Sequence, residues 1–542
     1  MTDVLPGHLG DWDRWADESR GGPAAPAGSG VTAGKRIAML GWAWPPMQER
    51  EGTGYNLVQS ETALGLVARG HRVYFLRSGL SYTLRPGMHI RLRDCWRGVA
   101  CFDLFNSPNV ASADRNFLNV RRQVAAPAHT EMVLAWCRAV KAELVHVQSF
   151  EGFAFEVVRV LRGAGFPVVV TPHNYYALCP QVDLMHRERR TCDDFAGGER
   201  CVGCIPAPDP GTEARRRAFD QTCERMLGHG VGPALRGLPG ALKRGLGALR
   251  SGRPVIRTPE AVRPSPERAA PLGPERGDDQ KRLLRTDTHL VVMNDYGDRR
   301  VAGVRALSEA SVVLCPGRTL MQVHRAMGVD PRVLRHVPLG LPHVDDITRA
   351  REEGGDPVPW SPGAGRPLRV AYMGSVKPNK GLGVLVAALA GLARDLPAPI
   401  ECEIHAEGGR RLLGGPVASL PWVRWMGRYA PSDVAGIVGA CDVGVFPNQG
   451  LENCPLVLLE FLAGGRPVLA SNLGASADWI KPSDSGWLFD HTSPADLEAL
   501  LRSLLAGTAR IPTRSHVAAS AGVPTFDAYM RGVLDAYALA CG

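Results

Sequence analysis

Two glutamates in an apolar stretch are the residues with the clearest chemical potential. In "NQGLENCPLVLLEFLAGGRPVLAS", residues 448–471, Glu452 precedes a proline and Glu460 follows it within a hydrophobic run. A buried carboxylate is costly unless it is paired or accepts hydrogen bonds, so Glu460 needs a partner, which need not be protein. A capping carboxylate at Glu452 and a buried ion pair at Glu460 are the structural alternative to a ligand site.

Local signals put both glutamates at one edge of a parallel sheet. Pro455 suits the first turn of a helix, and Gly464 and Gly465 suit its end. The apolar runs "DVGVFP" and "RPVLAS" on either side are typical of strands. The segment therefore predicts a β-α-β unit, with Glu452 in the loop before the helix and Glu460 about one turn further in. Ligands of such sheets bind beyond the carboxyl ends of the strands, where helix N-termini attract anions.

Three more segments carry candidate binding groups at similar positions. "EGTGYN" has Gly52 and Gly54 between a predicted strand and helix, where glycine either lets backbone amides approach a ligand or simply permits a tight turn. "GSVKPNKG" brings Lys377 and Lys380 to a predicted helix start, where a phosphate could meet an ammonium group; solvated lysines are the alternative. His173 ends the apolar strand in "TPHNYYALCP", where a ligand-binding role and a purely structural one both remain open.

The composition is typical of a soluble globular enzyme. Of the 542 residues, 45% are hydrophobic and 22% charged, and no apolar run approaches the ~20 residues of a membrane span. The net charge of +9 comes without basic clusters interleaved with aromatic residues, which argues against nucleic acid and favours anionic small molecules or a membrane surface. Thirteen scattered cysteines, and a start unlike a secretion signal, predict mostly reduced thiols in a cytoplasmic protein, with the inner membrane surface as an alternative location.

The alternation of apolar strands and helices predicts two doubly wound α/β domains of Rossmann type that face each other across a cleft. Strands are expected at residues 36–40, 71–77, 144–149, 167–173, 288–294 and 311–317, and then at 368–374, 400–406, 422–427, 442–447 and 466–471. The expected units are a disordered tail (1–33), an N-terminal domain (34–343) with a basic Pro-, Gly- and Arg-rich insertion (205–286), a linker (344–367), a C-terminal domain (368–520) and a final helical segment (521–542) that packs back towards the first domain. Leucines on one helical face of residues 235–249 suggest membrane-surface docking, and a loosely ordered surface insertion is the alternative.

The order of these motifs resembles glycosyltransferase family 4, retaining enzymes with the two-lobed GT-B fold. The resemblance covers residues 37–540 apart from the insertion, and it is most specific around the two glutamates. It implies that Lys380 binds the donor diphosphate, Glu460 the nucleotide ribose and Glu452 the sugar hydroxyls, with His173 beside the sugar and Gly52 to Gly54 over the diphosphate. Further donor contacts are expected at Ser375, Lys377, Asn453, Cys454, Pro455 and Leu456. Many family members have arginine where this chain has Ser375, so we expect Lys377 to compensate or phosphate binding to be weaker.

The resemblance also implies the course of the reaction. Lys380, Lys377 and helix amides would neutralise the leaving diphosphate of a UDP-, GDP- or ADP-sugar without a metal, so no cofactor is expected for catalysis. The leaving phosphate would accept the acceptor's proton, and no protein base is expected. The acceptor would be a glycan, a lipid-linked sugar or a small molecule. A nucleotide-sugar 2-epimerase of the same fold and a non-catalytic nucleotide-sugar-binding subunit of a polysaccharide assembly system are the competing interpretations.

Four cysteines cluster in the segment that follows His173. Cys179, Cys192, Cys201 and Cys204 lie within "CPQVDLMHRERRTCDDFAGGERCVGC", which ends in a Cys-x-x-Cys knuckle. Four thiolates can hold a tetrahedral structural zinc, although this spacing is not one of the common zinc-finger patterns. Reduced thiols and a disulfide are the alternatives. In each case the loop would shape the acceptor side of the cleft.

Overall fold

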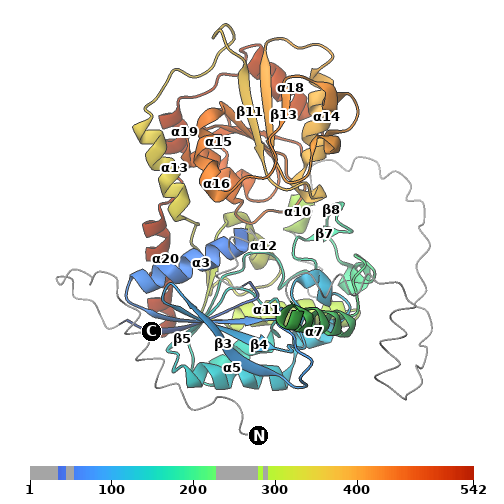
Figure 1. The fold of residues 1–542 in the computed structure, drawn as a ribbon, viewed down its shortest axis with the longest axis vertical. Coiled ribbons are helices and arrows are strands. Elements are labelled where there is room, and N and C mark those ends of the chain that lie inside the picture. Colours follow the sequence, from blue (N-terminus) through green and yellow to red (C-terminus); the bar gives the residue numbers. More distant parts are fainter. Residues whose placement is uncertain (1–33, 44–53, 228–278, 285–290) are drawn as a thin grey trace, which may run out of the picture.

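The chain forms two α/β domains, each built around its own sheet (Figure 1). The computed structural model describes residues 34–43, 54–227, 279–284 and 291–542. In Figure 1 the C-terminal domain, coloured orange, lies above the N-terminal domain, coloured blue to green. The doubly wound α/β architecture predicted from the alternating pattern is therefore confirmed.

The N-terminal domain contains an eight-stranded sheet with the order β10-β9-β6-β5-β1-β2-β4-β3. Its strands are β1 Arg36–Gly41, β2 Arg72–Ser78, β3 His89–Trp96, β4 Val99–Phe105, β5 Leu144–Val147, β6 Val168–Val170, β9 Val312–Cys315 and β10 Leu334–His336. The central strands are buried and mostly apolar because helices cover both faces of a parallel sheet. Only β3 runs antiparallel to its neighbour, β4, and its more exposed residues suit an edge strand.

The C-terminal domain contains a six-stranded parallel sheet with the order β13-β12-β11-β14-β15-β16. Its strands are β11 Leu368–Met373, β12 Ile400–His405, β13 Val423–Trp425, β14 Val443–Phe446, β15 Val468–Ser471 and β16 Gly486–Phe489. A short hairpin of β7 Met185–His186 and β8 Arg190–Thr191 forms a separate sheet in the segment that carries the clustered cysteines.

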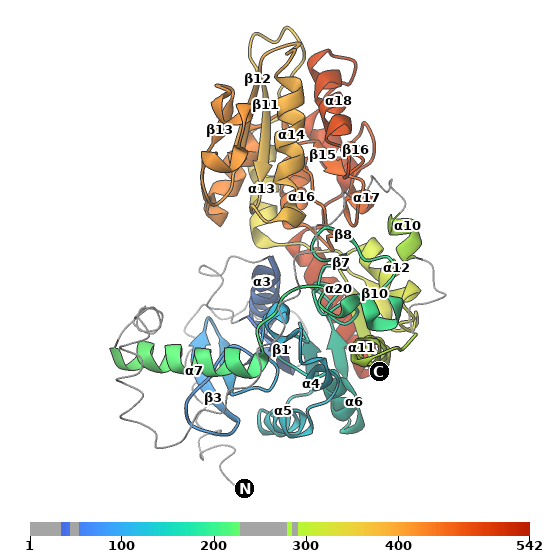
Figure 2. The same cartoon turned by 90° about the vertical axis from the view of Figure 1, so that its right-hand side faces the viewer.

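Helices cover both sheets, and α7 extends along one side of the N-terminal domain (Figure 2). In the N-terminal domain they are α3 Gly54–Ala68, α4 Val120–Val124, α5 Pro127–Ala139, α6 Glu156–Gly163, α7 Pro210–Leu227, α10 Asp279–Leu283, α11 Asp295–Glu309 and α12 Arg318–Ala326. From there on they are α13 Pro342–Glu353, α14 Leu382–Leu392, α15 Val434–Ala440, α16 Leu456–Ala463, α17 Ser476–Trp479, α18 Pro494–Leu505, α19 Arg514–Ala521 and α20 Phe526–Cys541.

The last helix, α20, packs against the N-terminal domain, at the left of Figure 1. The Tyr529 hydroxyl lies 2.8 Å from Thr62 Oγ1 on α3, and the Tyr537 hydroxyl lies 2.7 Å from His146 Nδ1 on β5. Both pairs are buried, so each polar group has the partner that burial requires. One hydrophobic cluster runs from this face of the N-terminal sheet through α20 to α13 and α16, and it joins the two domains.

Several elements differ from the sequence-based expectation. No strand forms in the described part of residues 288–294: Val291 and Val292 are each 45% exposed, and Asn294 caps α11 by accepting a hydrogen bond from Tyr296 N. The segment predicted as a linker begins with α13, which buries Val344 and Ile347. The predicted insertion begins with α7 and ends with α10, whereas the predicted tail and the leucine-rich stretch lie outside the described residues.

Candidate functional site

The loop that follows β11 is held in a fixed conformation against the end of β14, the neighbouring strand of the sheet. Gly381 has a φ of +70°, and a Cβ there would come 1.6 Å from the carbonyl oxygen of Pro447. Only glycine fits a left-handed backbone at such a close approach. The Tyr372 hydroxyl donates to the Ser375 carbonyl at 2.8 Å. The loop thereby fixes the position of Lys380 at the carboxyl edge of the sheet.

Lys380 forms an ion pair with Glu452. Its Nζ donates a hydrogen bond to Glu452 Oε1, and the two side chains are 33% and 20% exposed. Burial alone would lower the pKa of Lys380, but Glu452 and then Asp183 outweigh burial, and the pKa is raised. The ammonium group is therefore charged and lies beside a carboxylate at the start of α16. Lys377, by contrast, is exposed.

Glu460 is buried on α16 and has a protein partner that the sequence did not reveal. His343 Nε2, at the start of α13, lies 2.9 Å from Glu460 Oε1, and the Glu460 residue is 6% exposed. The buried pair expected under the structural alternative therefore exists for one oxygen. Within the described residues nothing hydrogen-bonds to Oε2, which leaves that oxygen for a ligand.

His173 lies on the N-terminal side of the domain boundary. Its Nε2 is 2.7 Å from Gln148 Oε1, and its ring meets the Tyr55 ring edge-on at 5.0 Å between centroids. Burial lowers the pKa of His173 to about 3, so the imidazole is neutral at physiological pH. Since Gln148 Oε1 can only accept, His173 Nε2 carries the proton and Nδ1 carries the lone pair.

Contacts across the domain boundary bring the two sets of residues together. Asn453 Nδ2 donates to the carbonyl of Pro172, the neighbour of His173, at 3.2 Å. A Cβ on Gly54, the first residue of α3, would lie 3.4 Å from Leu456 Cδ1 at the start of α16. The start of α3, His173 and the loop before α16 therefore meet at one place, as a binding cleft between the domains requires.

The remaining predicted donor contacts lie along the same loops. Ser375 Oγ is buried without a hydrogen-bond partner among the described residues. Pro455 is the N-cap of α16, and burial raises the pKa of the Cys454 thiol to about 12, so this thiol stays protonated. Gly52 falls in the range 44–53, outside the described residues.

Hydrogen bonds between Thr319 and Asp478, further along the boundary, also join the domains. Thr319, on α12, donates through its backbone N to Asp478 Oδ2 at 2.9 Å and through its hydroxyl to Asp478 Oδ1 at 2.8 Å. Asp478 belongs to α17 of the C-terminal domain. The structure therefore shows the two domains in a closed arrangement.

Asp183, like His343, is a site residue that sequence reasoning missed. It follows the first clustered cysteine in the chain, yet its Oδ2 accepts a hydrogen bond from Asn379 Nδ2 of the C-terminal domain at 3.3 Å. It is also close enough to Glu452 and Lys380 for their charges to affect its pKa. The sequence signal was an acidic residue in the segment that follows His173, but nothing in the pattern indicated that this segment crosses to the other domain.

The four clustered cysteines are buried close to one another. All thirteen cysteines of the chain are free, which excludes the disulfide alternative in this structure. Burial raises the pKa of Cys192 and of Cys201 to about 12, and neighbouring thiols of the cluster add to the rise. In the part of the chain that is described, no three His, Cys, Asp or Glu side chains are arranged to hold a metal ion. The zinc site stays a prediction.

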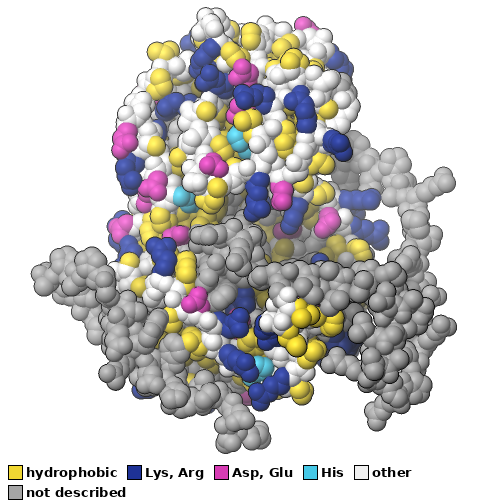
Figure 3. Space-filling view, in the orientation of Figure 1, with side chains coloured by type: hydrophobic (Ala, Val, Ile, Leu, Met, Phe, Trp, Pro, Cys, Tyr) yellow, Lys and Arg dark blue, Asp and Glu magenta, His cyan; other side chains and the backbone are white. Residues whose placement is uncertain are grey.

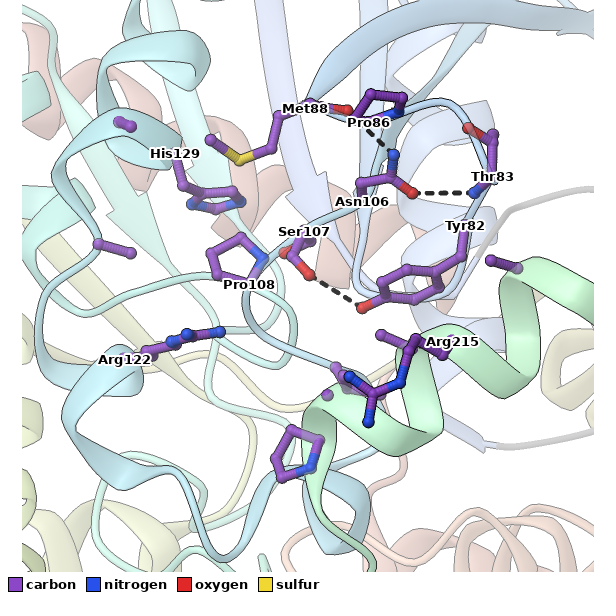
Figure 4. A pocket seen from close by; sticks show the side chains of 18 of the residues that line it. Tyr82, Thr83, Pro86, Met88, Asn106, Ser107, Pro108, Arg122, His129 and Arg215 are labelled. Carbon is purple, nitrogen blue, oxygen red and sulfur yellow. Dashed lines mark hydrogen bonds between the residues drawn. The ribbon is translucent and has the colours of Figure 1, made fainter. Parts of the chain in front are cut away.

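A separate pocket of about 690 Å³ lies among the loops that follow β2 and β4 and the starts of α5 and α7 (Figure 4). Tyr82, whose hydroxyl donates to the Ser107 carbonyl at 3.0 Å, lies on one side, and Arg122 and Arg215 are among the basic residues that line it. None of the residues described above at the cleft lines this pocket. It is therefore distinct from the Lys380–Glu452 site.

The surface shows mixed charge on the side seen in Figure 3, where basic side chains lie scattered among acidic ones on the C-terminal domain. Among the helices that the structure describes, none is long and apolar enough to span a membrane.

Comparisons with known proteins agree with this architecture. Residues 367–507 match the family described as Glycosyl transferases group 1. A phosphatidyl-myo-inositol mannosyltransferase from Propionibacterium freudenreichii is 33% identical over 187 residues, covering 33% of this chain and 44% of the relative. A D-inositol 3-phosphate glycosyltransferase from Corynebacterium kroppenstedtii is 28% identical over 233 residues, covering 38% and 50%. The chain thus spans about half the length of these curated relatives, or less.

Solved structures resemble nearly the whole chain. The Anabaena protein HepE in complex with UDP has a TM-score of 0.52 at 13% identity, covering 93% of this chain and 99% of that one. Sucrose-phosphate synthase from Thermosynechococcus elongatus has a TM-score of 0.53 at 16% identity, covering 93% and 98%. At such low identity the likeness shows the fold alone. Residues 367–507 thus match the group 1 glycosyltransferases, and the two domains of the chain have the GT-B fold.

Proposed function

We propose that the chain transfers a sugar from a nucleoside diphosphate sugar to an acceptor hydroxyl, with retention of configuration at the anomeric carbon. One observation carries the proposal: the Lys380–Glu452 pair at the start of α16 lies at the carboxyl edge of the sheet, in the region that matches the family, next to the N-terminal residues around His173. A cation beside a helix N-terminus attracts a diphosphate, and a nearby carboxylate accepts hydrogen bonds from sugar hydroxyls.

Donor binding would separate this pair and give each residue a new partner on the donor. In this structure Lys380 pairs with Glu452. A diphosphate carries more negative charge than one carboxylate, so it would draw the Lys380 ammonium to itself and release Glu452 for the sugar. Glu460 keeps His343 on Oε1 and would accept from the ribose through Oε2. Lys377, Ser375 and the first amides of α16 would add contacts to the phosphates.

His173 would contact the transferred sugar from the other side. Its Nδ1 lone pair can accept a hydrogen bond from a sugar hydroxyl, because the Nε2 proton is held by Gln148. A neutral imidazole is suited to this task, since a positive charge there would oppose the positive charge that develops on the sugar ring. We propose that no divalent metal takes part, because Lys380 and helix amides can neutralise the leaving diphosphate.

The acceptor would bind on the N-terminal side of the cleft. The curated relatives are named for phosphatidyl-myo-inositol and for D-inositol 3-phosphate, so inositol-containing acceptors belong in a first screen beside glycans and lipid-linked sugars. Reaction at a lipid-linked acceptor would take place at the inner membrane surface, with the protein otherwise in the cytoplasm.

A panel of nucleotide sugars tests the proposal by thermal shift. A donor present at a hundred times its dissociation constant adds about 2.7 kcal/mol to the unfolding free energy, so the correct donor should raise Tm. Lys380→Gln should abolish the shift, whereas Lys141→Gln should keep it, because the exposed Lys141 precedes β5 at the amino edge of the N-terminal sheet, away from the cleft.

Product analysis completes the test. The donor that shifts Tm should support transfer to at least one acceptor of the screen, and NMR of the product should show the anomeric configuration of the donor. Binding with neither hydrolysis nor transfer would instead favour a non-catalytic subunit, and epimer formation without acceptor would favour an epimerase. If no nucleotide sugar shifts Tm at millimolar concentration, or if Lys380→Gln leaves the shift intact, the proposed donor site is wrong.

A further inference from the structure

The side chain of Asp183 crosses from the N-terminal domain to the donor loops of the C-terminal domain. Asn379 Nδ2, one residue before Lys380, donates to Asp183 Oδ2 at 3.3 Å. Next to it, Met185 Sδ lies 3.2 Å from the position of a Cβ on Gly450, in the loop that leads to Glu452. The segment around Asp183 therefore lies against both loops of the Lys380–Glu452 pair.

The backbone around Asp183 is held in an unusual conformation. Its two neighbours, Val182 and Leu184, have φ values of +73° and +49°. Left-handed backbone is unfavourable for residues with a Cβ, and most of all for a β-branched one, so the surroundings must hold it. Tyr175 N donates to the Val182 carbonyl at 2.9 Å, and Cys192 N donates to the Leu184 carbonyl at 2.6 Å. The strained segment anchors Leu184 in the interior and leaves the Asp183 carboxylate at the domain boundary.

One carboxylate oxygen of Asp183 is available. Oδ2 accepts from Asn379, while among the described residues nothing hydrogen-bonds to Oδ1, and the residue is partly exposed. Burial raises the pKa of Asp183 to about 6, and Glu452 adds to the rise, whereas Lys380 and Lys377 oppose it. A carboxylate is most effective in proton transfer when its pKa is close to the working pH.

We propose that Asp183 is a catalytic residue of the sugar transfer and accepts the proton of the acceptor hydroxyl. This inference rests on the proposed function. As the acceptor oxygen bonds to the anomeric carbon, its O–H bond breaks and the proton passes to Asp183 Oδ1. The bond between the anomeric carbon and the phosphate oxygen breaks, and its electron pair leaves with the nucleoside diphosphate, whose charge Lys380 neutralises. Asp183 then returns its proton to water.

The position of Asp183 agrees with retention. It lies with Lys380, which would hold the leaving diphosphate, so an acceptor activated by Asp183 approaches from the side of the leaving group. Glu452 is less suited to the same task because the sugar would use it as an acceptor of hydrogen bonds once the diphosphate has drawn Lys380 away. The proton therefore has a destination on the protein, separate from the leaving phosphate that the family resemblance implied.

Asp183→Asn is the first variant that tests the assignment. The amide keeps the shape and can still pair with Asn379, but it cannot take the proton. The transfer kcat should fall ~10²- to 10⁴-fold while donor affinity, measured by calorimetry, changes less than about threefold. Glu188→Gln is the matched control, since it removes the same charge from the exposed turn of the same segment. Because Glu188 contributes less than burial and Glu452 to the raised pKa of Asp183, kcat should stay near the wild-type value with at most a small downward shift of the pH profile.

The pH profile and chemical rescue distinguish a proton-accepting role of Asp183 from a purely structural one. In the wild type, kcat should fall as pH drops through about 6 or somewhat above, because Asp183 must be ionised and a bound diphosphate would add negative charge beside it. Asp183→Asn should lack this acidic limb. In Asp183→Ala, formate should restore part of kcat, because a free carboxylate can enter the vacated space.

Asn379→Ala distinguishes a base from a mere contact between domains. It removes the hydrogen bond across the boundary but leaves the carboxylate, so kcat should stay within about tenfold of the wild type and the acidic limb should remain. If Asn379→Ala reproduces the loss seen in Asp183→Asn, or if Asp183→Asn keeps kcat or the acidic limb, the assignment is overturned. A wild type that binds donor but transfers no sugar would refute the proposed function itself.

Discussion

Each of the two glutamates around α16 has a cationic or imidazole partner on the protein, and the two partners differ in kind. His343 belongs to the interior contact between α13 and α16, so Glu460 can keep it while a ligand occupies its other oxygen. Lys380 is needed by the diphosphate, so Glu452 must give it up when the donor binds. Glu460 therefore serves a contact that persists through the reaction, whereas Glu452 serves one that forms with the donor.

This difference predicts opposite kinetic effects. Glu460→Gln should raise the donor KM ~10- to 100-fold with kcat less affected, because the ribose hardly changes as the sugar departs. Glu452→Gln should lower kcat by a similar factor, because its charge lies near the sugar that becomes positive in the transition state. The range corresponds to ~1.5–3 kcal/mol for a hydrogen bond to an ionised group. Steady-state kinetics with the donor found by thermal shift measures both constants.

Glu353→Gln, at the exposed end of α13, serves as the control and should change neither constant. Unfolding curves of all three variants check that loss of the buried Glu460 charge has not simply unfolded the protein. Near-normal constants for both site variants with every donor would refute the assignment of this motif to the nucleotide sugar.

Sequence patterns located one part of the site and missed another for a physical reason. Glu452, Glu460 and Lys380 lie in two short segments whose strand, loop and helix signals are local, so their place at a sheet edge could be deduced. Asp183 and His343 reach the site only through contacts between residues far apart in the chain. Such contacts depend on how the two domains dock, which a periodic pattern does not encode.

At the scale of elements, the apolar run 288–294 shows how a local pattern can mislead. Valine and methionine at residues 291–293 favour a strand, but the described residues of this run lead directly into α11 and are exposed. Conversely, β3 escaped prediction because arginine and aspartate alternate with its apolar residues, as suits an edge strand with one solvated face. Strands β1, β2, β5, β6 and β9 were predictable because both of their faces are covered, whereas the equally buried β4 was not predicted.

The loop with the clustered cysteines has an electrostatic feature that bears on metal binding. Arg299 and Arg300 on α11 are 0% and 3% exposed, and within the described residues no carboxylate forms an ion pair with either. The thiols of Cys179, Cys192 and Cys201 are the groups that raise the pKa of Arg300, against the larger opposing effect of burial. Thiolates around a zinc ion would supply the negative charge that two buried guanidinium groups need.

We therefore predict about one zinc ion per chain in protein purified without chelator. Replacement of both Cys201 and Cys204 by serine should remove it, whereas the same replacement of Cys223 and Cys541, outside the cluster, should not. The sulfur atoms would have to move closer together than they lie here. Metal analysis that finds no zinc in the wild type would reject the site. Activity lost in EDTA should return with zinc alone, since transfer itself is expected to need no magnesium or manganese.

At the scale of the whole molecule, a few polar contacts around the cleft add to the hydrophobic cluster that joins the two domains. Asp478 accepts two hydrogen bonds from Thr319, and Asn453 and Asn379 each make one more contact across the boundary. A donor that touches both domains binds only the closed form, so these contacts add to its apparent affinity.

Asp478→Ala should therefore open the domains and weaken donor binding. The loss of hydrogen bonds to an ionised group is worth ~1.5–3 kcal/mol, which corresponds to roughly ten- to a hundredfold in the closing equilibrium. Small-angle scattering should show a larger radius of gyration without donor, and calorimetry a weaker affinity. Asp484→Ala, which removes a pair with His516 inside the C-terminal part, is the control. An unchanged radius of gyration and donor affinity would show that the hydrogen bonds between Asp478 and Thr319 do not hold the domains closed.

The position of α20 has a consequence for the order in which the protein is made. The helix follows the C-terminal domain in the chain, yet Met530, Val533 and Tyr537 fill the core of the N-terminal domain, which is synthesised before it. Until they arrive, His146 lacks the Tyr537 hydroxyl and Thr62 lacks the Tyr529 hydroxyl, and the apolar surface around them is exposed to water. The N-terminal domain therefore cannot complete its core before α20 has been synthesised. It must wait for the C-terminal domain to be synthesised, so that folding of the two domains ends as a single event.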